Sequence, residues 1–163
     1  MKALQTCCLT GHRDLPADTR LLEARLTEAV RGRLAQGVRY FGVGGAVGFD
    51  TLAAEVLLNL RDTLYPQIRV IAVEPFDGFT SRWTDAQRAR RQTLLPRYDK
   101  RVCLLPRGSR EAYLARDRYL VDNSAHCISY CNRTSGGTAY TVRYALRRGL
   151  YVENLGSLNV ALF

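Results

Sequence analysis

Short apolar runs alternate with longer amphipathic runs along almost the whole chain. The segment "IRVIAV" (68–73) is apolar at nearly every position, which is typical of a strand buried on both faces of a parallel sheet. The longer runs repeat apolar residues every three or four positions, as Leu22, Leu26 and Val30 do, and this spacing puts them on one face of a helix. The hydrophobic pattern therefore predicts alternating strands and helices.

Six strands and five helices are expected from this pattern. The strands are expected at residues 3–11, 38–45, 65–75, 100–106, 125–131 and 150–155, and the helices at 17–37, 48–62, 81–98, 111–124 and 137–149. Ser81 is the expected N-cap of the third helix, and Gly37 the stop after the first. Strict alternation predicts an α/β fold: a Rossmann-like, doubly wound, mainly parallel sheet with helices on both faces, in three layers.

Length and composition fit one domain, residues 1–163, whose cysteines are in the reduced thiol form. A chain of 163 residues is of ordinary single-domain size, and no apolar run approaches the ~18 residues that cross a bilayer. The first residues turn polar too soon for a signal peptide, so a cytoplasmic protein without a membrane partner is expected. Five cysteines without a CxxC pair, and only two histidines, predict buried reduced thiols and no metal site.

Candidate ligand-binding residues lie where the strands end. Doubly wound sheets bind ligands beyond the carboxyl ends of their strands. The segments "GGAVGFDT" (44–51) and "SGGT" (135–138) put glycines and a hydroxyl at a helix start, where unpaired N–H groups attract anions. Together they predict a phosphate-binding cleft with two glycine-rich walls. Tight turns that bind nothing are the alternative, because a GxGxxG fingerprint does not occur.

Other side chains are expected at the same edge. Arg13 would pair with a phosphate, and Trp83 would stack on a base or anchor its helix to the sheet. Glu55 or Glu74 would serve as acid, base or ribose ligand, and Asp50 is another candidate for holding the ribose. Arg116 shares a helix face with Tyr119 and Asn123, whereas Arg118 faces Asp122. The expected ligand-binding residues are Thr10, Gly11, His12, Arg13, Gly44, Gly45, Gly48, Phe49, Asp50, Thr51, Glu74, Pro75, Phe76, Trp83, Arg116, Arg118, Gly136, Gly137 and Thr138.

The net charge of +9 adds a second hypothesis. Residues 79–110 hold nine Arg or Lys against Asp85 and Asp99, a difference of seven. Such a stretch is either a solvated helix face or a groove for single-stranded nucleic acid, for which Phe79, Trp83 and Tyr98 offer stacking surfaces.

Five ordered blocks make the chain resemble the YpsA-type family of the SLOG superfamily, a Rossmann-like group that includes the Lonely Guy proteins and DNA-processing protein A. These blocks are "TGHR" (10–13), "GGAVGFDTLAAE" (44–55), "IAVEPFDG" (71–78, with "RW" at 82–83), "RDRYLVDNS" (116–124) and "GGTAYTVRYA" (136–145). The resemblance implies a Rossmann-like fold that binds a nucleotide-derived ligand such as ADP-ribose or NAD, with no certain cofactor.

The two relatives imply different activities. Lonely Guy enzymes hydrolyse nucleoside monophosphates with the glutamate of a PGGxGTxxE motif, and Arg143 or Thr141 stands at that place here. Glu55 or Glu74 would have to substitute, so enzymatic activity stays open, while Arg116 and Arg118 resemble that group's phosphate-contacting arginines. DNA-processing protein A binds single-stranded DNA, but Val47 replaces the arginine usual in its glycine block.

The leading hypothesis is a sensor or regulatory protein that binds a nucleotide-like molecule. A hydrolase of nucleotide glycosidic bonds and a module that binds single-stranded nucleic acid weakly through residues 79–110 are the alternatives. A homo-oligomer formed through an exposed helix face, and the role of the apolar tail 156–163, stay open.

Overall fold

The computed structural model describes residues 2–163. The strands are β1 (Thr6–Gly11), β2 (Tyr40–Val43), β3 (Arg69–Phe76), β4 (Lys100–Leu105), β5 (His126–Tyr130) and β6 (Tyr151–Asn154). The helices are α1 (Arg20–Ala35), α2 (Phe49–Thr63), α3 (Asp85–Leu94), α4 (Arg110–Asp122) and α5 (Gly137–Arg147), with short 3-10 helices η1 (Lys2–Gln5), η2 (Leu95–Arg97) and η3 (Val160–Leu162). The predicted alternation of strands and helices is confirmed.

All six strands run parallel, in the order β4-β3-β2-β1-β5-β6. The chain builds outward from β1 to β4 and then returns to place β5 on the other side of β1. The loops after β1 and β5 therefore leave neighbouring strands toward opposite faces of the sheet. A crevice opens at such a switch point, and ligands of doubly wound folds bind there.

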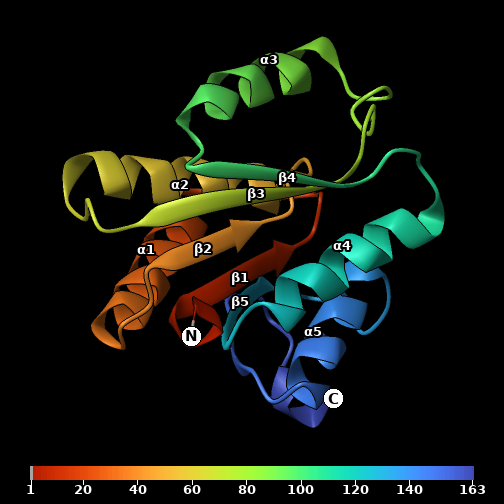
Figure 1. Cartoon of the computed structure of the whole chain (residues 1–163). Helices are drawn as coiled ribbons and strands as arrows, with labels where there is room; N and C mark the ends of the chain where they lie inside the picture. Colours follow the sequence, from red (N-terminus) through yellow and green to blue (C-terminus); the bar gives the residue numbers. More distant parts are fainter. Residues whose placement is uncertain (1) are drawn as a thin grey trace.

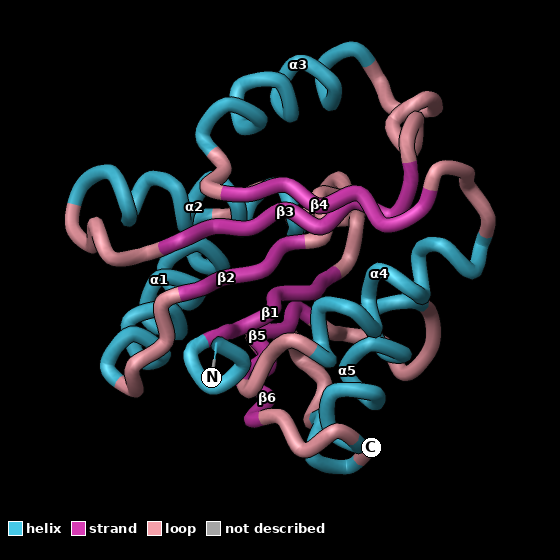
Figure 2. Tube along the Cα trace, viewed as in Figure 1, coloured by secondary structure: helices cyan, strands magenta, loops and turns pink. Residues whose placement is uncertain are grey.

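Helices cover both faces of the sheet, as predicted (Figures 1 and 2). One core joins α1 and α2 to the sheet around Leu26, Phe41 and Leu57, and the other joins α4 and α5 to it around Cys8 and Leu120. α3 lies beyond β4 at the edge of the sheet, and its last residues reach the core under α2. Within residues 2–163, no helix is both long and apolar enough to cross a membrane.

Three local predictions are corrected. α3 begins after Thr84 rather than Ser81, because Thr84 and Gln87 form a reciprocal capping box while Trp83 turns inward. Cys103 is exposed, because β4 is an edge strand with one neighbour, although all five cysteines are free thiols. The first strand starts at Thr6, after a 3-10 turn.

Arg118 and Asp122, which the i, i+4 spacing places on one helix face, do not form an ion pair with each other. Arg118 instead donates to the carboxylate of Glu111 and to the hydroxyl of Tyr140. Asp122 accepts from Tyr144 and lies 3.3 Å from Arg148, on the neighbouring helix α5. Each side chain thus has other partners. Arg118 contacts Glu111 of its own helix and Tyr140 of α5, and Asp122 contacts Tyr144 and Arg148 of α5.

Candidate ligand-binding cleft

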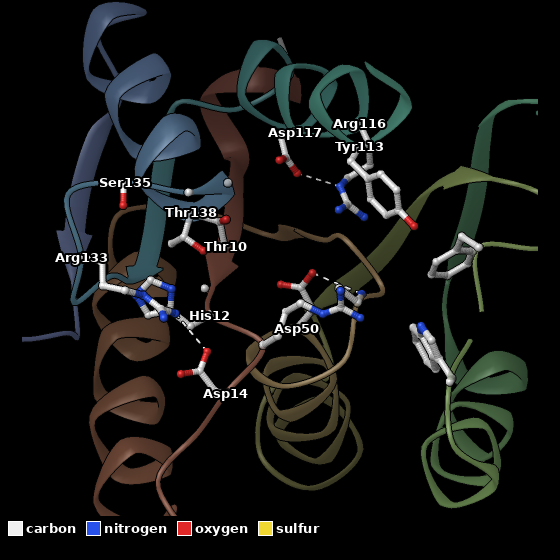
Figure 3. A pocket seen from close by; sticks show the side chains of 17 residues that line it. Thr10, His12, Asp14, Asp50, Tyr113, Arg116, Asp117, Arg133, Ser135 and Thr138 are labelled. Atoms are coloured by element: carbon white, nitrogen blue, oxygen red, sulfur yellow. Dashed lines mark hydrogen bonds and ion pairs between the residues drawn. The ribbon is translucent and has the colours of Figure 1, made fainter. Parts of the chain in front are cut away.

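A cleft of about 470 Å³ opens at the carboxyl ends of β1 and β5 (Figure 3). Its size is within the ~300–1,000 Å³ usual for small-molecule sites. The lining residues are Thr10, Gly11, His12, Arg13, Asp14, Ala46, Asp50, Phe79, Trp83, Tyr113, Arg116, Asp117, Arg133, Ser135, Gly136, Gly137 and Thr138. The structure thus brings ten of the expected ligand-binding residues together with seven others.

One end of the cleft is built to attract an anion. α5 starts at Gly137, and its first helical bond runs from the amide of Tyr140 to the carbonyl of Gly136. The amides of residues 137–139 therefore have no acceptor within the helix, and no side chain caps them. Arg13 has no carboxylate partner among the described residues, and Arg133 pairs with Asp14 at 2.9 Å.

His12 joins the two loops that form this end. Its Nε2 accepts the amide N–H of Asn132 at 2.8 Å, and its ring edge packs on Tyr130. Burial, helped by the charge of Arg133, lowers the pKa of His12, so the imidazole accepts this bond in its neutral form. The predicted contact residue His12 thus lines the cleft and also holds its walls together.

The tail supports the same loop from behind. The amide of Ser157 donates to Oδ1 of Asn132 at 2.7 Å, and Asn154 Nδ2 donates to the carbonyl oxygens of Cys131 and Leu158. Val160 packs into a small core with Cys131 and α5. The tail, whose role the sequence left open, fixes the loop that carries Arg133 and leads into α5.

Aromatic rings line another side of the cleft. Phe79 and Trp83 pack edge to face with centroids 5.5 Å apart, and Tyr113 approaches from α4. Trp83 is only 8% exposed, so it anchors the segment before α3 to the fold while part of its ring faces the cleft. Such surfaces suit a planar ligand group.

The floor holds a buried arginine between two carboxyl groups. Arg116 donates from Nε to Asp117 Oδ1 at 2.7 Å and from a second nitrogen to the carbonyl of Gly44. Asp50 accepts the amide N–H of Ala46 at 3.2 Å. Burial raises the pKa of Asp50 to about 7, against the lowering effect of Arg116, and burial also raises the pKa of Asp117. The cleft floor thus holds two buried carboxyl groups beside one buried arginine.

The early glycine turn packs against the protein itself, which corrects its expected role as a ligand-facing wall. A Cβ on Gly48 would lie 2.2 Å from the carbonyl oxygen of Arg13, and one on Gly44 would lie 2.7 Å from Asp50 Oδ2. Gly44, Gly45, Gly48 and Thr51 do not line the cleft, and the Thr51 hydroxyl donates to the carbonyl of Ala46. Gly48 thus permits close approach to the β1 loop, and Gly44 leaves room for the side chains of Asp50 and Arg116.

The other expected residues lie outside the cleft. Glu55 is bound by Arg90, and Glu74 by Arg91 and Arg101, so neither carboxylate is free for acid–base work or a ribose. Phe49 is fully buried and stacks on Tyr130. Pro75, Phe76 and Arg118 also do not line the cleft.

Seven lining residues were not on the expected list: Asp14, Ala46, Phe79, Tyr113, Asp117, Arg133 and Ser135. Arg133 and Ser135 occur in the segment after β5, and Asp117 follows Arg116, so their positions in the sequence indicate that they could line the site. Tyr113 lies one helical turn before Arg116 on α4, and only the placement of α4 brings it to the cleft. For Phe79 the sequence predicts only a stacking surface for single-stranded nucleic acid.

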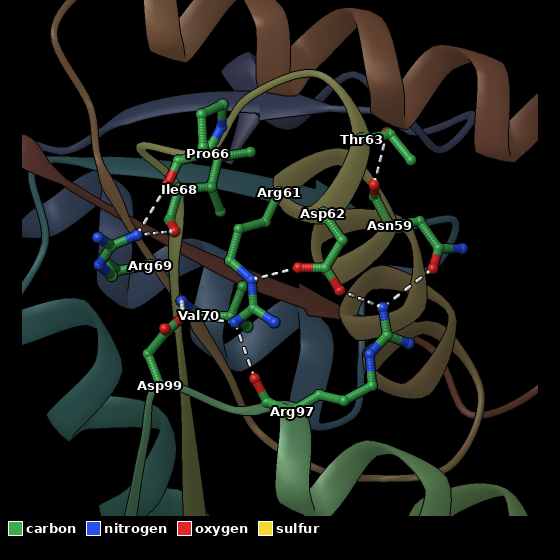
Figure 4. A network of polar contacts seen from close by, with 10 residues as sticks. All are labelled: Asn59, Arg61, Asp62, Thr63, Pro66, Ile68, Arg69, Val70, Arg97 and Asp99. Carbon is green, nitrogen blue, oxygen red and sulfur yellow. Dashed lines mark hydrogen bonds and ion pairs between the residues drawn. The ribbon is translucent and has the colours of Figure 1, made fainter.

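Most of the basic residues in 79–110 are neutralised within the fold. Arg90 and Arg91 are paired with Glu55 and Glu74, and Arg97 is paired with Asp62 (Figure 4). Arg88 and Arg101 also have carboxylate partners. Among the described residues, no carboxylate pairs with Arg82, Lys100, Arg107 or Arg110. The stretch therefore leaves four of its nine basic residues without a carboxylate partner within residues 2–163.

Comparison with known proteins agrees with this architecture. The model described as the YspA SLOG family (YpsA) matches residues 9–150. A UPF0398 protein of Lactiplantibacillus plantarum is 31% identical over 80 residues, which cover 49% of this chain and 42% of that protein. One of Bacillus velezensis is 23% identical over 130 residues, 78% of this chain and 69% of that protein. The chain thus aligns with less than half of the Lactiplantibacillus protein's length.

Two solved structures share the fold. DNA processing protein A of Streptococcus pneumoniae superposes with a TM-score of 0.66 at 18% identity, covering 94% of this chain and 50% of that chain. DNA processing protein A of Helicobacter pylori, whose structure concerns single-stranded DNA binding, gives 0.63 at 17% identity, covering 99% and 78%. At these identities the likeness concerns the fold alone.

Proposed function

The chain belongs to the YspA SLOG family, and on this premise we propose that its cleft binds a nucleotide-derived small molecule such as ADP-ribose or NAD. The protein would act as a sensor or regulator through that ligand. One observation carries the proposal: the open N-terminus of α5, beside Arg13 and Arg133, shares a single cleft with the rings of Trp83 and Tyr113. A phosphate suits the first region and a base the second.

The carboxyl groups between these regions suit sugar hydroxyls. Asp50 and Asp117 lie on the cleft floor, where each oxygen left free by Arg116 and Ala46 can accept a hydroxyl hydrogen bond. Of the two residues expected to hold a ribose, Asp50 is the one that lines the cleft, whereas Glu74 is held by two arginines. Phosphate, sugar and base would thus follow one another across the cleft.

Binding can be measured by thermal shift and by the fluorescence of Trp83, the single tryptophan. The panel is NAD, ADP-ribose, AMP and cyclic nucleotides at ~0.15 M salt. A ligand at about a hundred times its Kd adds roughly 2.7 kcal/mol of stability and raises the melting temperature. No shift and no fluorescence change with any member would contradict the proposal.

Gly137→Val is expected to abolish this binding while leaving the fold intact. Gly137 lines the cleft at the first turn of α5, lacks a positive φ, and has open space around its missing Cβ. The new side chain would therefore fill the anion end of the cleft without strain, and affinity should fall at least about tenfold, roughly 1.4 kcal/mol. Titration of the ligand that gave the largest shift checks it.

Gly32→Val is the matched control, because Gly32 lies in α1 with open space and no positive φ. It should keep full affinity, and equal losses in both variants would count against the cleft. Gly45→Val would not be a clean test, because Gly45 has a φ of +73°, where valine strains the backbone, and lies outside the lining of the cleft.

A second candidate function is weak binding of single-stranded nucleic acid, favoured by exposed Arg82, Arg107 and Arg110, which lack carboxylate partners among residues 2–163. Reversing all three to Glu should weaken binding to a short oligothymidylate and flatten its salt dependence by about 0.7 in log–log slope per lost phosphate contact. Fluorescence anisotropy across salt concentrations measures both effects.

Arg88, Arg90 and Arg91 are unsuitable for that test, because each is held in an ion pair and its reversal would disturb the fold. An unchanged affinity and slope in the Arg82, Arg107 and Arg110 variant would remove the nucleic-acid reading for this stretch. A glycosidic hydrolase that uses Glu55 gains no support, since Glu55 lies outside the cleft.

A further inference from the structure

A second pocket, of about 340 Å³, lies on the α4 face of the sheet, away from the cleft. Its floor is formed by alternate residues of neighbouring strands: Gly42 on β2, Ile71 and Val73 on β3, and Val102 on β4. Residues two apart on a strand share a face, so this floor is continuous and apolar. Leu120 of α4 forms one wall.

The pocket exists because α4 leaves part of the sheet uncovered. At its start α4 packs over the end of β3, where Tyr113 meets Phe76, and at its end it packs on β2, where a Cβ on Gly42 would lie 2.8 Å from Leu120. In Figure 1, α4 runs from the side where β3 and β4 end toward the start of β1, so the first residues of β3 and β4 lie away from it. Parallel sheets are normally covered on both faces, yet here Ile71 and Val102 remain partly exposed.

Positive charge surrounds this apolar floor. Lys2, Arg69 and Lys100 line the pocket, and the ammonium of Lys2 lies 5.8 Å from the centroid of the Tyr40 ring. The one acidic lining residue is Asp99, whose Oδ2 already accepts from Arg61 at 2.9 Å and from the amide of Val70 at 2.8 Å (Figure 4). The pocket thus offers an excess of cations to a ligand.

Polar side-chain groups are also available at the rim of the pocket. Tyr40 and Tyr119 line the pocket, and among the described residues neither hydroxyl has a hydrogen-bond partner. Asn123 donates through Nδ2 to the carbonyl of Tyr119, which leaves its own side-chain oxygen free. A pocket with an apolar floor and a few convergent polar groups is the usual form of a small-molecule site.

We propose that this pocket binds a small molecule with an apolar body and a single anionic end group, such as a medium-chain carboxylate. The body would lie on Ile71, Val73 and Val102, and the carboxylate would meet Lys2 and Lys100. A second copy of this chain is disfavoured as occupant, because its own net charge of +9 would repel the basic rim. Nucleic acid is disfavoured by the apolar floor. This site is independent of the proposed nucleotide cleft.

Sodium octanoate is the probe, below its micelle-forming concentration, with octylammonium as the matched cation. Amide shifts in ¹H–¹⁵N spectra should move for residues 71–73, 100–102 and 119–124 with octanoate, and not with octylammonium. Amides of residues 10–14 and 133–138, at the cleft, should stay unchanged. Equal shifts with both probes, or shifts confined to the cleft, would overturn the proposal.

Variants test the charge and the floor separately. The double change Lys2→Glu with Lys100→Glu is expected to weaken octanoate binding about tenfold, since it replaces two attractions with repulsions. Val102→Trp should fill the pocket and abolish binding, and Val102 is partly exposed on an edge strand, so the fold should tolerate it.

Arg25→Glu is the matched control, because Arg25 is exposed on α1 and lines neither pocket. It should leave octanoate binding unchanged. If Arg25→Glu weakens binding as much as the lysine reversals, or if Val102→Trp folds and still binds octanoate, the pocket is not the site. Binding to phosphatidylglycerol vesicles or to oligothymidylate without binding to octanoate would equally overturn the proposal.

Discussion

Gly48→Ala is expected to lower the free energy of unfolding by about 3–5 kcal/mol and to disrupt the cleft. Gly48 has a φ of +79° and a ψ of −124°, a conformation that L side chains rarely adopt. An added Cβ would also lie 2.2 Å from the carbonyl oxygen of Arg13, where backbone meets backbone. The next amide, of Phe49, donates to the carbonyl of His12 at 3.0 Å, so relief by movement would break that bond. Urea unfolding measures the loss.

Gly78→Ala separates the two causes of this loss. Gly78 has a similar φ of +80°, but nothing lies within 4 Å of its missing Cβ. It should therefore report conformational strain alone, about 1–2 kcal/mol. If Gly48→Ala destabilised the protein no more than Gly78→Ala does, the contact between the glycine turn and the β1 loop would not matter to the fold.

Asp50→Asn is expected to stabilise the protein above neutral pH relative to the wild type. Burial raises the pKa of Asp50 from 3.8 to about 7, which corresponds to about 4 kcal/mol of pH-dependent free energy as an upper value. Below pH ~4 the carboxyl is protonated in both folded and unfolded chains. As pH rises toward 7 the unfolded chain loses this proton first, so the wild type loses stability; above pH 7 the loss is complete.

The measurement is the difference in unfolding free energy between Asp50→Asn and wild type at pH 5 and pH 8. We expect this difference to grow by about 2–3 kcal/mol toward pH 8, because part of the loss has already occurred at pH 5. His12 and His126, whose pKa values burial lowers, contribute a rise in stability with pH up to about 6.5, but they are present in both proteins and cancel. Asp77→Asn, at an exposed position, is the control. If the difference in unfolding free energy between Asp50→Asn and wild type were the same at pH 5 and pH 8, the raised pKa of Asp50 would be contradicted.

The alternation of apolar and amphipathic runs was sufficient to predict the fold class and the edge at which the cleft lies. Both depend on one-dimensional periodicity, which parallel sheets express strongly because their strands are apolar throughout. The same logic places Thr10 to Arg13 and Gly136 to Thr138 at the ends of β1 and β5, which the structure makes neighbours.

The role of the early glycine turn could not be predicted this way. Glycine allows close approach of any group, and the sequence does not say whether that group is a ligand or, as for Gly48, the protein's own backbone. The ion-pair partners of Glu55 and Glu74 could not be predicted from the sequence either, because only the placement of α3 in the fold brings Arg90 and Arg91 to them. Tertiary packing decides which charged groups remain available.

The cleft draws its walls from opposite ends of the chain, and this has a consequence for biosynthesis. The bond between His12 and the amide of Asn132 joins residues 120 positions apart, and α5 follows only after residue 136. Strands β1 to β4 can pair while the ribosome is still adding β5, because they form a contiguous half of the sheet. A nascent chain in that state lacks the anion end of the cleft, which the segment after β5 and the start of α5 supply. Occupancy of the cleft would therefore distinguish a finished chain from a partly translated one.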